Sequence, residues 1–224
     1  MIIHPICGLC NYLRVVFSYY QKALKDNEEL VVIWRKTAEC PGYFLDYFEK
    51  IDKIKFVSDN KNFKKIYYRG FSICPEFSPN YKYLKPCKKI FKKIIKNIKL
   101  LENNYDAIHI RRTDHIAIVK SFNKFTSDEE FIDFVDKSKS KYLYIATDNR
   151  ETQNKFFDKY SKKLKVIKFI DSSKIKNLRK TSLEDAIIDL YMCVYSKNFK
   201  GSSFSSFSDT IRDIRKQVPS ILDI

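Results

Sequence analysis

Glycine is scarce in this chain, and its scarcity excludes two common ways of binding a nucleotide. The 224 residues include four glycines. Neither G-x-G-x-x-G nor G-x-x-x-x-G-K-[ST] occurs, so the chain has no dinucleotide-binding fingerprint and no P-loop. A phosphate group would therefore have to be held by arginine side chains and backbone N–H groups.

Patterns typical of a metal site are also missing. The chain has three histidines and no D-x-D, which argues against a histidine site and against a carboxylate pair for a metal–diphosphate. Cys7 and Cys10 form a C-x-x-C pair, but no second pair follows at zinc-ribbon spacing. We interpret the six cysteines as reduced thiols, several of them packing residues. We expect no metal and no other cofactor.

Long apolar runs are absent as well. No stretch approaches the roughly 18 uninterrupted apolar residues typical of a transmembrane helix. Residues 1–7 lack the basic and apolar regions of a signal peptide. These two absences predict a cytoplasmic protein without a membrane span.

Positive charge is abundant. The net charge of +16, from 43 Lys and Arg against 27 Asp and Glu, attracts polyanions such as nucleic acid, acidic glycans, anionic lipids and nucleotide phosphates. Lysine is spread along the whole chain, as in proteins from AT-rich genomes, so the charge alone identifies no ligand. The stretch 86–101 has the pattern of a basic amphipathic helix. We interpret it as a packed helix with one solvated face, and contact with an anionic membrane surface is the alternative.

Strand and helix patterns alternate, which predicts an α/β protein with parallel sheets and helices on both faces. The alternation is interrupted between 60 and 86, where we expect an irregular connection. We predict two Rossmann-like domains, 1–85 and 86–224, facing one cleft with the ligand site at the carboxyl ends of the strands. The expected strands are 2–7, 30–34, 54–57, 106–111, 142–146, 165–170 and one near 199; the expected helices are 11–25, 44–51, 86–101, 128–138, 151–162, 182–195 and one from 206.

The most informative stretch is His109-Ile110-Arg111-Arg112-Thr113-Asp114, at the end of a predicted buried strand. Arginine presents a planar fork of donors that matches phosphate oxygens, and it keeps its charge near neutral pH. Strand alternation places His109 and Arg111 on one side and Arg112 on the other. The pattern fits a phosphate site centred on Arg111, and it fits two surface arginines at a strand–loop junction equally well.

Three further strand ends carry groups suited to an anion or a nucleoside. Gly8 opens a turn into a helix in which Arg14 lies one turn inside. The polar loop 200–206 enters another helix, whose first N–H groups favour an anion. Asp148 ends a third strand and could accept hydrogen bonds from a base or a ribose. Each has a local alternative, which is turn formation for Gly8 and helix capping for the serines and Asp148.

Together these segments resemble a known family. His109 to Asp114 is similar to the H-x-R-R-x-D motif of the α1,6-, nodulation-factor and protein O-fucosyltransferases. Gly8 to Arg14 resembles the G-x-G-N-x-x-R turn of related families, with Cys10 in place of the second glycine. Ala146-Thr147-Asp148 and Gly201 to Ser206 resemble the family's A-T-D strand end and G-[TS]-x-S-S loop. The motifs follow the family's order over most of the chain.

The resemblance implies a GT-B-like pair of domains and inverting, metal-independent transfer of L-fucose from GDP-fucose to a glycan or another hydroxyl acceptor. The N-terminal domain would be the acceptor side and the C-terminal domain the nucleotide-sugar side. Arg111 would bind the β-phosphate and stabilise the departing GDP. No nucleic-acid partner is expected, and a cytoplasmic enzyme of this kind without a Golgi anchor indicates a microbial or viral source. The implied donor-binding residues are Asn11, Arg14, His109, Arg111, Asp148, Ser203, Phe204, Ser205 and Ser206.

One departure from the family concerns the catalytic base. The α1,6 enzymes have a glutamate at the position that is Val119 in this chain. We predict a catalytic role for Asp114; His115, Glu39 or the leaving phosphate are the alternative proton acceptors. Three other functions remain open from the sequence: transfer of another GDP-sugar, non-catalytic binding of nucleic acid or another polyanion, and an inactive relative.

Overall fold

The computed structural model describes residues 1–59, 63, 65–113, 125–161, 165–167 and 181–218. The chain divides into two compact units. The first comprises Met1–Lys89 and Lys216–Val218, and the second includes Ile90–Arg215. The sequence did not indicate that residues 216–218 join the first unit. Among the described residues, no helix is long and apolar enough to cross a bilayer.

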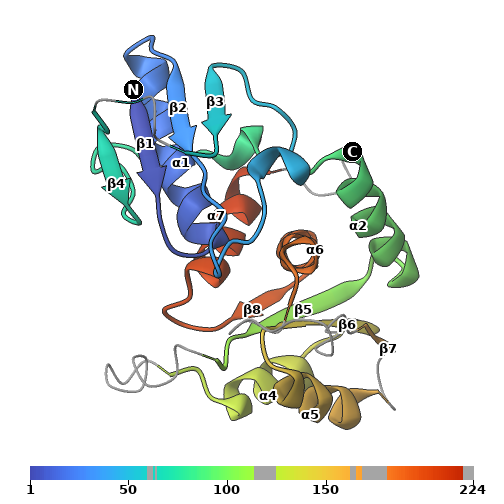
Figure 1. Cartoon of the computed structure of the whole chain (residues 1–224). Helices are drawn as coiled ribbons and strands as arrows, with labels where there is room; N and C mark the ends of the chain where they lie inside the picture. Colours follow the sequence, from blue (N-terminus) through green and yellow to red (C-terminus); the bar gives the residue numbers. More distant parts are fainter. Residues whose placement is uncertain (60–62, 64, 114–124, 162–164, 168–180, 219–224) are drawn as a thin grey trace. The chain divides into compact units, whose positions relative to one another are not determined.

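The first unit is built on a parallel sheet with strand order β3-β2-β1-β4 (Figure 1). Helix α1 packs against β1 and β2, because apolar residues at helical spacing bury one of its faces. The elements are β1 (Ile2–Pro5), α1 (Leu9–Lys25), β2 (Leu30–Ile33), the 3-10 helix η1 (Phe44–Asp46), β3 (Ile54–Val57), β4 (Tyr68–Gly70) and the 3-10 helix η2 (Tyr81–Tyr83).

Strand β4 corrects the prediction of an irregular connection between 60 and 86. It pairs in parallel with β1 at the edge of the sheet. The ring of Tyr68 stacks on Tyr19 of α1, with centroids 4.8 Å apart. A three-residue strand is too short to produce an alternating pattern, so only the pairing with a distant strand and the packing on α1 reveal it.

The second unit contains another parallel sheet, with strand order β7-β6-β5-β8. Two parallel sheets with helices confirm the predicted α/β class. Residues 168–170 of the predicted strand 165–170 lie outside the described residues. The elements are α2 (Lys88–Leu100), β5 (Tyr105–Ile110), α4 (Asp128–Asp136), β6 (Tyr142–Thr147), α5 (Arg150–Tyr160), β7 (Lys165–Ile167), α6 (Leu183–Val194), β8 (Phe199–Gly201) and α7 (Ser206–Gln217).

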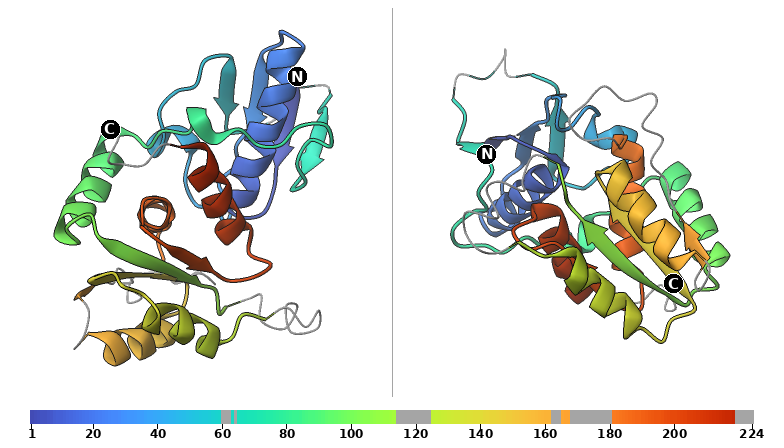
Figure 2. Two further views of the ribbon diagram at one scale, coloured as in Figure 1. Left: turned by 180° about the vertical axis from the view of Figure 1, so that it is seen from behind. Right: turned by 90° about the horizontal axis from the view of Figure 1, so that it is seen from below.

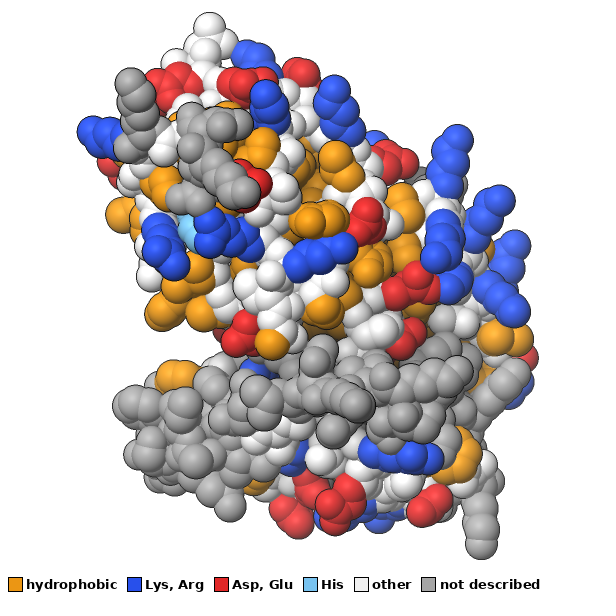
Figure 3. Space-filling model, viewed as in Figure 1, with side chains coloured by type: hydrophobic (Ala, Val, Ile, Leu, Met, Phe, Trp, Pro, Cys, Tyr) orange, Lys and Arg blue, Asp and Glu red, His pale blue; other side chains and the backbone are white. Residues whose placement is uncertain are grey.

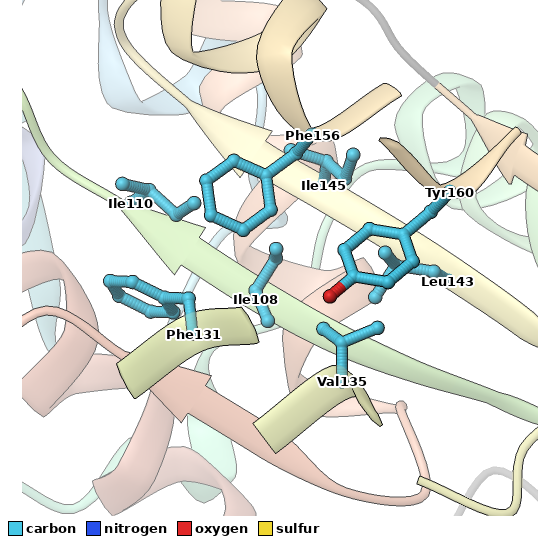
Figure 4. Packing of buried hydrophobic residues seen from close by; sticks show 8 residues of the cluster. All are labelled: Ile108, Ile110, Phe131, Val135, Leu143, Ile145, Phe156 and Tyr160. Atoms are coloured by element: carbon cyan, nitrogen blue, oxygen red, sulfur yellow. The ribbon is translucent and has the colours of Figure 1, made fainter. Parts of the chain in front are cut away.

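Helices cover both faces of this sheet (Figures 1 and 2). On one face, side chains of β5 and β6 pack against α4 and α5 (Figure 4). Burying each large apolar side chain in this core contributes about 1.5–3 kcal/mol. The cluster consists of Ile108, Ile110, Phe131, Val135, Leu143, Ile145, Phe156 and Tyr160.

The opposite face of the sheet carries the alternate residues of β5 and β6. Tyr144 donates a hydrogen bond to Asp189 of α6 at 2.6 Å, and Tyr105 donates to the carbonyl of Met192 at 2.8 Å. Because strand residues alternate in direction, His109 also points to this face, toward α7. One face of β5 therefore packs in the apolar core, and the other face places His109 next to the start of α7.

Candidate functional site

Three of the predicted segments follow strands that end at the same edge of the second sheet. Ile110 of β5 lies opposite Thr147 of β6, and His109 lies opposite Gly201 of β8. All these strands are parallel, so the loops after β5, β6 and β8 begin side by side. This edge is where a ligand of an open α/β sheet is expected.

Hydrogen bonds join the loop after β5 to the loop after β8. The backbone N–H of Arg111 donates to the Ser202 hydroxyl at 3.0 Å, and the Ser202 N–H donates to the carbonyl of His109 at 2.9 Å. The Ser203 N–H donates to the Thr126 hydroxyl at 2.9 Å. Both loops are therefore held in fixed positions, and Ser203 already uses its backbone donor within the protein.

Asp148 connects the loop after β6 to the loop after β5. Its two carboxylate oxygens accept hydrogen bonds from the Arg112 N–H at 2.9 Å and from the Thr113 hydroxyl at 2.6 Å. The alternative in which Asp148 caps a helix is wrong, because Asn149 caps α5 by accepting the Thr152 N–H at 2.7 Å. Asp148 thus orders the strand-end loops, and its contact with a nucleoside remains a prediction.

The side chain of Arg112 is held within the protein. Its guanidinium forms an ion pair with Asp128 at 2.7 Å and donates to the carbonyl of Thr126 at 2.9 Å. It also lies over the ring of Phe125, 4.5 Å from the ring centroid. With only a tenth of its side chain exposed, Arg112 stabilises the loop instead of facing a ligand.

Arg111, the other arginine of the pair, lies near the buried side chain of His109. The ring of His109 stacks on Phe207 at 4.6 Å, and its Nδ1 atom is 2.8 Å from the Ser208 hydroxyl. Burial, together with the positive charges of Arg111 and Arg212, lowers the pKa of His109 to about 3. His109 is therefore neutral near pH 7, and the charge of Arg111 contributes to the loss of its proton. That the Arg111 side chain points to the same side as His109 remains a prediction from strand alternation.

Helix α7 begins directly at this edge of the sheet. The Ser205 hydroxyl accepts the Ser208 N–H at 3.4 Å, so Ser205 caps the helix, as its local alternative predicts. A Cβ atom on Gly201 would lie 2.6 Å from the Ser208 hydroxyl and 2.8 Å from the Phe199 ring. Glycine at this position lets α7 approach the strand end, where the first helical N–H groups and the helix dipole favour an anion.

Phe204 has an unusual backbone conformation between β8 and α7. Its φ angle of 52° lies in the left-handed region, and its side chain is 45% exposed. A non-glycine residue in a sparsely populated region costs about 1–3 kcal/mol, so the surrounding loop must hold it in place. An aromatic ring therefore stands at the surface beside the start of α7.

Two predicted donor-binding residues, Asn11 and Arg14, belong to the first unit. They are half-buried and lie three residues apart in the first turns of α1, on the same side of the helix. The left-handed residue at the entrance of this helix is Cys7, with φ of 72°, whereas Gly8 is an ordinary N-cap with φ of −83°. The turn therefore does not depend on the conformational freedom of Gly8, and the roles of Asn11 and Arg14 remain predictions.

The candidates for the catalytic base are only partly covered by the structure. Asp114, His115 and Val119 lie outside the described residues. Glu39 is exposed in the first unit, in the segment that follows β2. Within the described part of the chain, no group of three or more His, Cys, Asp or Glu residues is placed to hold a metal ion.

Several residues at this edge were not indicated by the sequence. Thr126 binds the loop after β8, and Ser208 binds His109. Arg212 donates to the carbonyl of Gly201 at 3.1 Å. These residues lie within ordinary loop and helix patterns, and Thr126 and Ser208 are far along the chain from their partners, so no local signal distinguishes them.

Comparison with known proteins identifies the fold. The sequence matches no protein-family model and no curated protein. The structure is similar to NodZ α1,6-fucosyltransferase from Bradyrhizobium, with a TM-score of 0.64, 12% identity, and coverage of 94% of this chain and 91% of NodZ. It is also similar to POFUT1 in complex with GDP, with a TM-score of 0.68, 12% identity, and coverage of 98% and 95%. The chain therefore has a GT-B-like fold of the fucosyltransferase type, and the fold implied by the resemblance is confirmed.

Proposed function

We propose that this protein transfers L-fucose from GDP-fucose to a hydroxyl group of a glycan or similar acceptor, with inversion and without a metal ion. The observation that carries the proposal is the fold, shared over 94% and 98% of the chain with fucosyltransferases crystallised with GDP-fucose or GDP. The arrangement of Arg111, His109 and the start of α7 at one sheet edge supports it, since this edge suits a diphosphate.

The donor half of the reaction depends on stabilising the leaving group. As the bond between the sugar and the phosphate breaks, its electron pair passes to the phosphate oxygen and negative charge grows on GDP. The guanidinium of Arg111 and the amino end of α7 stabilise this charge from fixed positions. The neutral ring of His109 adds no positive charge, and its contact with Ser208 joins the end of β5 to the start of α7.

Attack by the hydroxyl that receives the sugar requires a group that takes up its proton. The acceptor oxygen attacks the anomeric carbon from the side opposite GDP, and its proton passes to a carboxylate or to the departing phosphate. We assign the role of proton acceptor to Asp114, with His115, Glu39 and the leaving phosphate as alternatives. His109 is not assigned this role, because a group whose pKa is about 3 is a weak base at neutral pH.

Nucleotide binding tests the proposal directly. Thermal unfolding should be measured with GDP, UDP, CMP and ADP, each with and without EDTA. We expect stabilisation by GDP alone, unaffected by EDTA, and of about 2.7 kcal/mol at a concentration one hundred times the Kd. Absence of stabilisation by every nucleotide, or an Arg111→Ala variant that binds GDP as well as the parent protein does, would contradict the proposal.

The identity of the sugar needs a separate measurement. GDP release from GDP-fucose should exceed release from GDP-mannose when an acceptor glycan is present. Equal or faster release from GDP-mannose would assign the protein to another GDP-sugar. GDP binding without release from either donor would identify an inactive relative.

A further inference from the structure

Helix α2 carries an unusual concentration of positive charge. Its 13 residues include six lysines, all exposed, and no acidic residue. Figure 3 shows a column of Lys or Arg side chains at the right, where Figure 1 places α2. At 3.6 residues per turn, four of the lysines fall within about 80° of the helix circumference. These four form what we call the α2 lysine stripe: Lys88, Lys92, Lys96 and Lys99.

The stripe lacks compensating negative charge. Lys93, outside the stripe, forms an ion pair with Glu184. None of the four stripe lysines has an ionic partner among the residues that the structure describes. Like charges at i,i+4, such as Lys88 with Lys92 and Lys92 with Lys96, destabilise a helix. A surface that supplies negative charge would remove this repulsion.

The buried face of α2 fixes the direction of the stripe. Ile90, Ile94 and Ile98 are 1%, 0% and 2% exposed and anchor the helix to the protein. The helix cannot rotate without exposing these side chains, so the lysines remain directed outward. The stripe is therefore a rigid feature and does not depend on a flexible tail.

Apolar side chains lie among the lysines. Leu100 is 44% exposed and Ile95 is half-buried. Together with Lys92, Lys96 and Lys99 they line a shallow hollow of about 420 Å³. Lysine side chains can extend their ammonium groups to lipid phosphates while their stems and neighbouring apolar groups enter the interface. A stripe of lysine flanked by an exposed leucine and a half-buried isoleucine fits a helix that lies on an anionic membrane.

We propose that the α2 lysine stripe binds the surface of an anionic lipid bilayer. The chemistry favours lipid over RNA, because α2 contains no arginine and its one aromatic residue, Phe91, is half-buried. The apolar lining of the hollow has no use in binding a phosphate backbone. This inference does not depend on the proposed transferase activity.

Vesicle sedimentation with the full chain tests the inference. The probes are phosphatidylcholine vesicles and vesicles in which about one third of the lipid is phosphatidylserine. We expect binding to the anionic vesicles alone, weakening as salt rises. The variant Lys92→Glu/Lys96→Glu/Lys99→Glu should bind at least about tenfold more weakly, since each lysine near the surface contributes to the attraction.

A matched variant separates the stripe from the overall charge. Lys50→Glu/Lys55→Glu/Lys139→Glu changes the net charge by the same amount at scattered exposed positions, and it should bind vesicles as the parent does. Leu100→Ser should weaken vesicle binding several-fold without changing its salt dependence. If the triple stripe variant does not fold, Lys96→Gln/Lys99→Gln replaces it.

Three results would overturn the inference. One is the absence of binding to anionic vesicles. Another is an equal loss of binding in the stripe variant and the scattered variant. The third is tight, salt-sensitive binding of single-stranded RNA that the stripe variant loses while vesicle binding stays absent, which would make nucleic acid the ligand.

Discussion

The guanidinium of Arg112 and the carboxylate of Asp128 form an ion pair at 2.7 Å, with the two side chains 10% and 22% exposed. The same guanidinium also lies over the ring of Phe125. Through these two contacts Arg112 holds the loop after β5 in place. The charge of Arg111, the preceding residue, acts on His109 and lowers its pKa, and strand alternation predicts that the Arg111 side chain points to the other side. If Arg111 binds the phosphate as proposed, the two adjacent arginines should respond differently to substitution.

Substituting the two arginines should separate activity from stability. Arg111→Lys keeps a charge but loses the planar fork, so we expect turnover to fall by roughly 10²-fold or more with little change in thermal unfolding. Arg112→Lys should lower the free energy of unfolding by about 2–3 kcal/mol, since it disrupts the partly buried pair with Asp128. Steady-state kinetics and urea denaturation measure the two effects.

One result would contradict this prediction for the two arginines. If Arg112→Lys abolished turnover in a fully folded protein while Arg111→Lys remained active, the assignment of Arg111 to the phosphate would be wrong. Arg150→Lys, which changes an exposed arginine at the start of α5, serves as a control and should alter neither quantity.

Burial of His109 predicts instability at acid pH. Its folded-state pKa of about 3 lies below the ordinary 6.5, so the unfolded chain takes up a proton first as the pH falls. Stability should therefore decrease between pH 6.5 and pH 3. In His109→Gln the decrease should be shallower, with a residual slope from His4, whose pKa burial also lowers. Unfolding temperatures across this range with the same slope in both proteins would refute the assignment.

The raised pKa of Asp189 predicts the opposite dependence of stability on pH. Burial raises its pKa to about 8 from 3.8, although the hydrogen bond from Tyr144 partly opposes the shift. The folded protein keeps this proton where the unfolded chain has lost it, so stability contributed by the protonated acid is lost as the pH rises from about 4 to about 8. Asp189→Asn retains an oxygen that can accept from Tyr144 and never ionises. Its denaturation midpoint should exceed that of the parent at pH 8, and identical midpoints throughout would count against the shift.

Gly201 predicts a steric effect at the start of α7. In Gly201→Ala the new methyl carbon would lie 2.6 Å from the Ser208 hydroxyl and 2.8 Å from the Phe199 ring, which is closer than these atoms can pack. We expect a loss of about 1–3 kcal/mol in unfolding free energy and weaker GDP binding, because α7 must move. Adding Ser208→Gly removes one of the two clashes and should restore part of the stability. The single variant Ser208→Gly is the reference, because it loses the contact with His109 by itself. A loss in the double variant equal to the sum of the two single losses would show that the Ser208 contact is not the cause.

Much of the fold could be predicted because its signals are local. Short apolar runs such as Leu30–Ile33 and helical spacing such as that of α1 depend on neighbouring residues alone. The edge strand β4 escaped prediction because three residues carry no period, and its position depends on pairing with β1. The return of residues 216–218 to the first unit likewise depends on contacts with distant segments, such as that of Gln217 with Tyr81.

The sequence by itself determined the α/β class, most of the strands and helices and the absence of glycine-rich nucleotide motifs, because these depend on spacing and residue type. It offered Arg111 as the phosphate candidate through its resemblance to the fucosyltransferase motif. Only the tertiary structure decided that Arg112 is committed to Asp128, that His109 is buried and neutral, and that Asp148 orders the strand-end loops. Each of these properties arises from burial or from a hydrogen-bond partner far away in the chain. Such partners meet only when parallel strands bring their carboxyl ends to one edge.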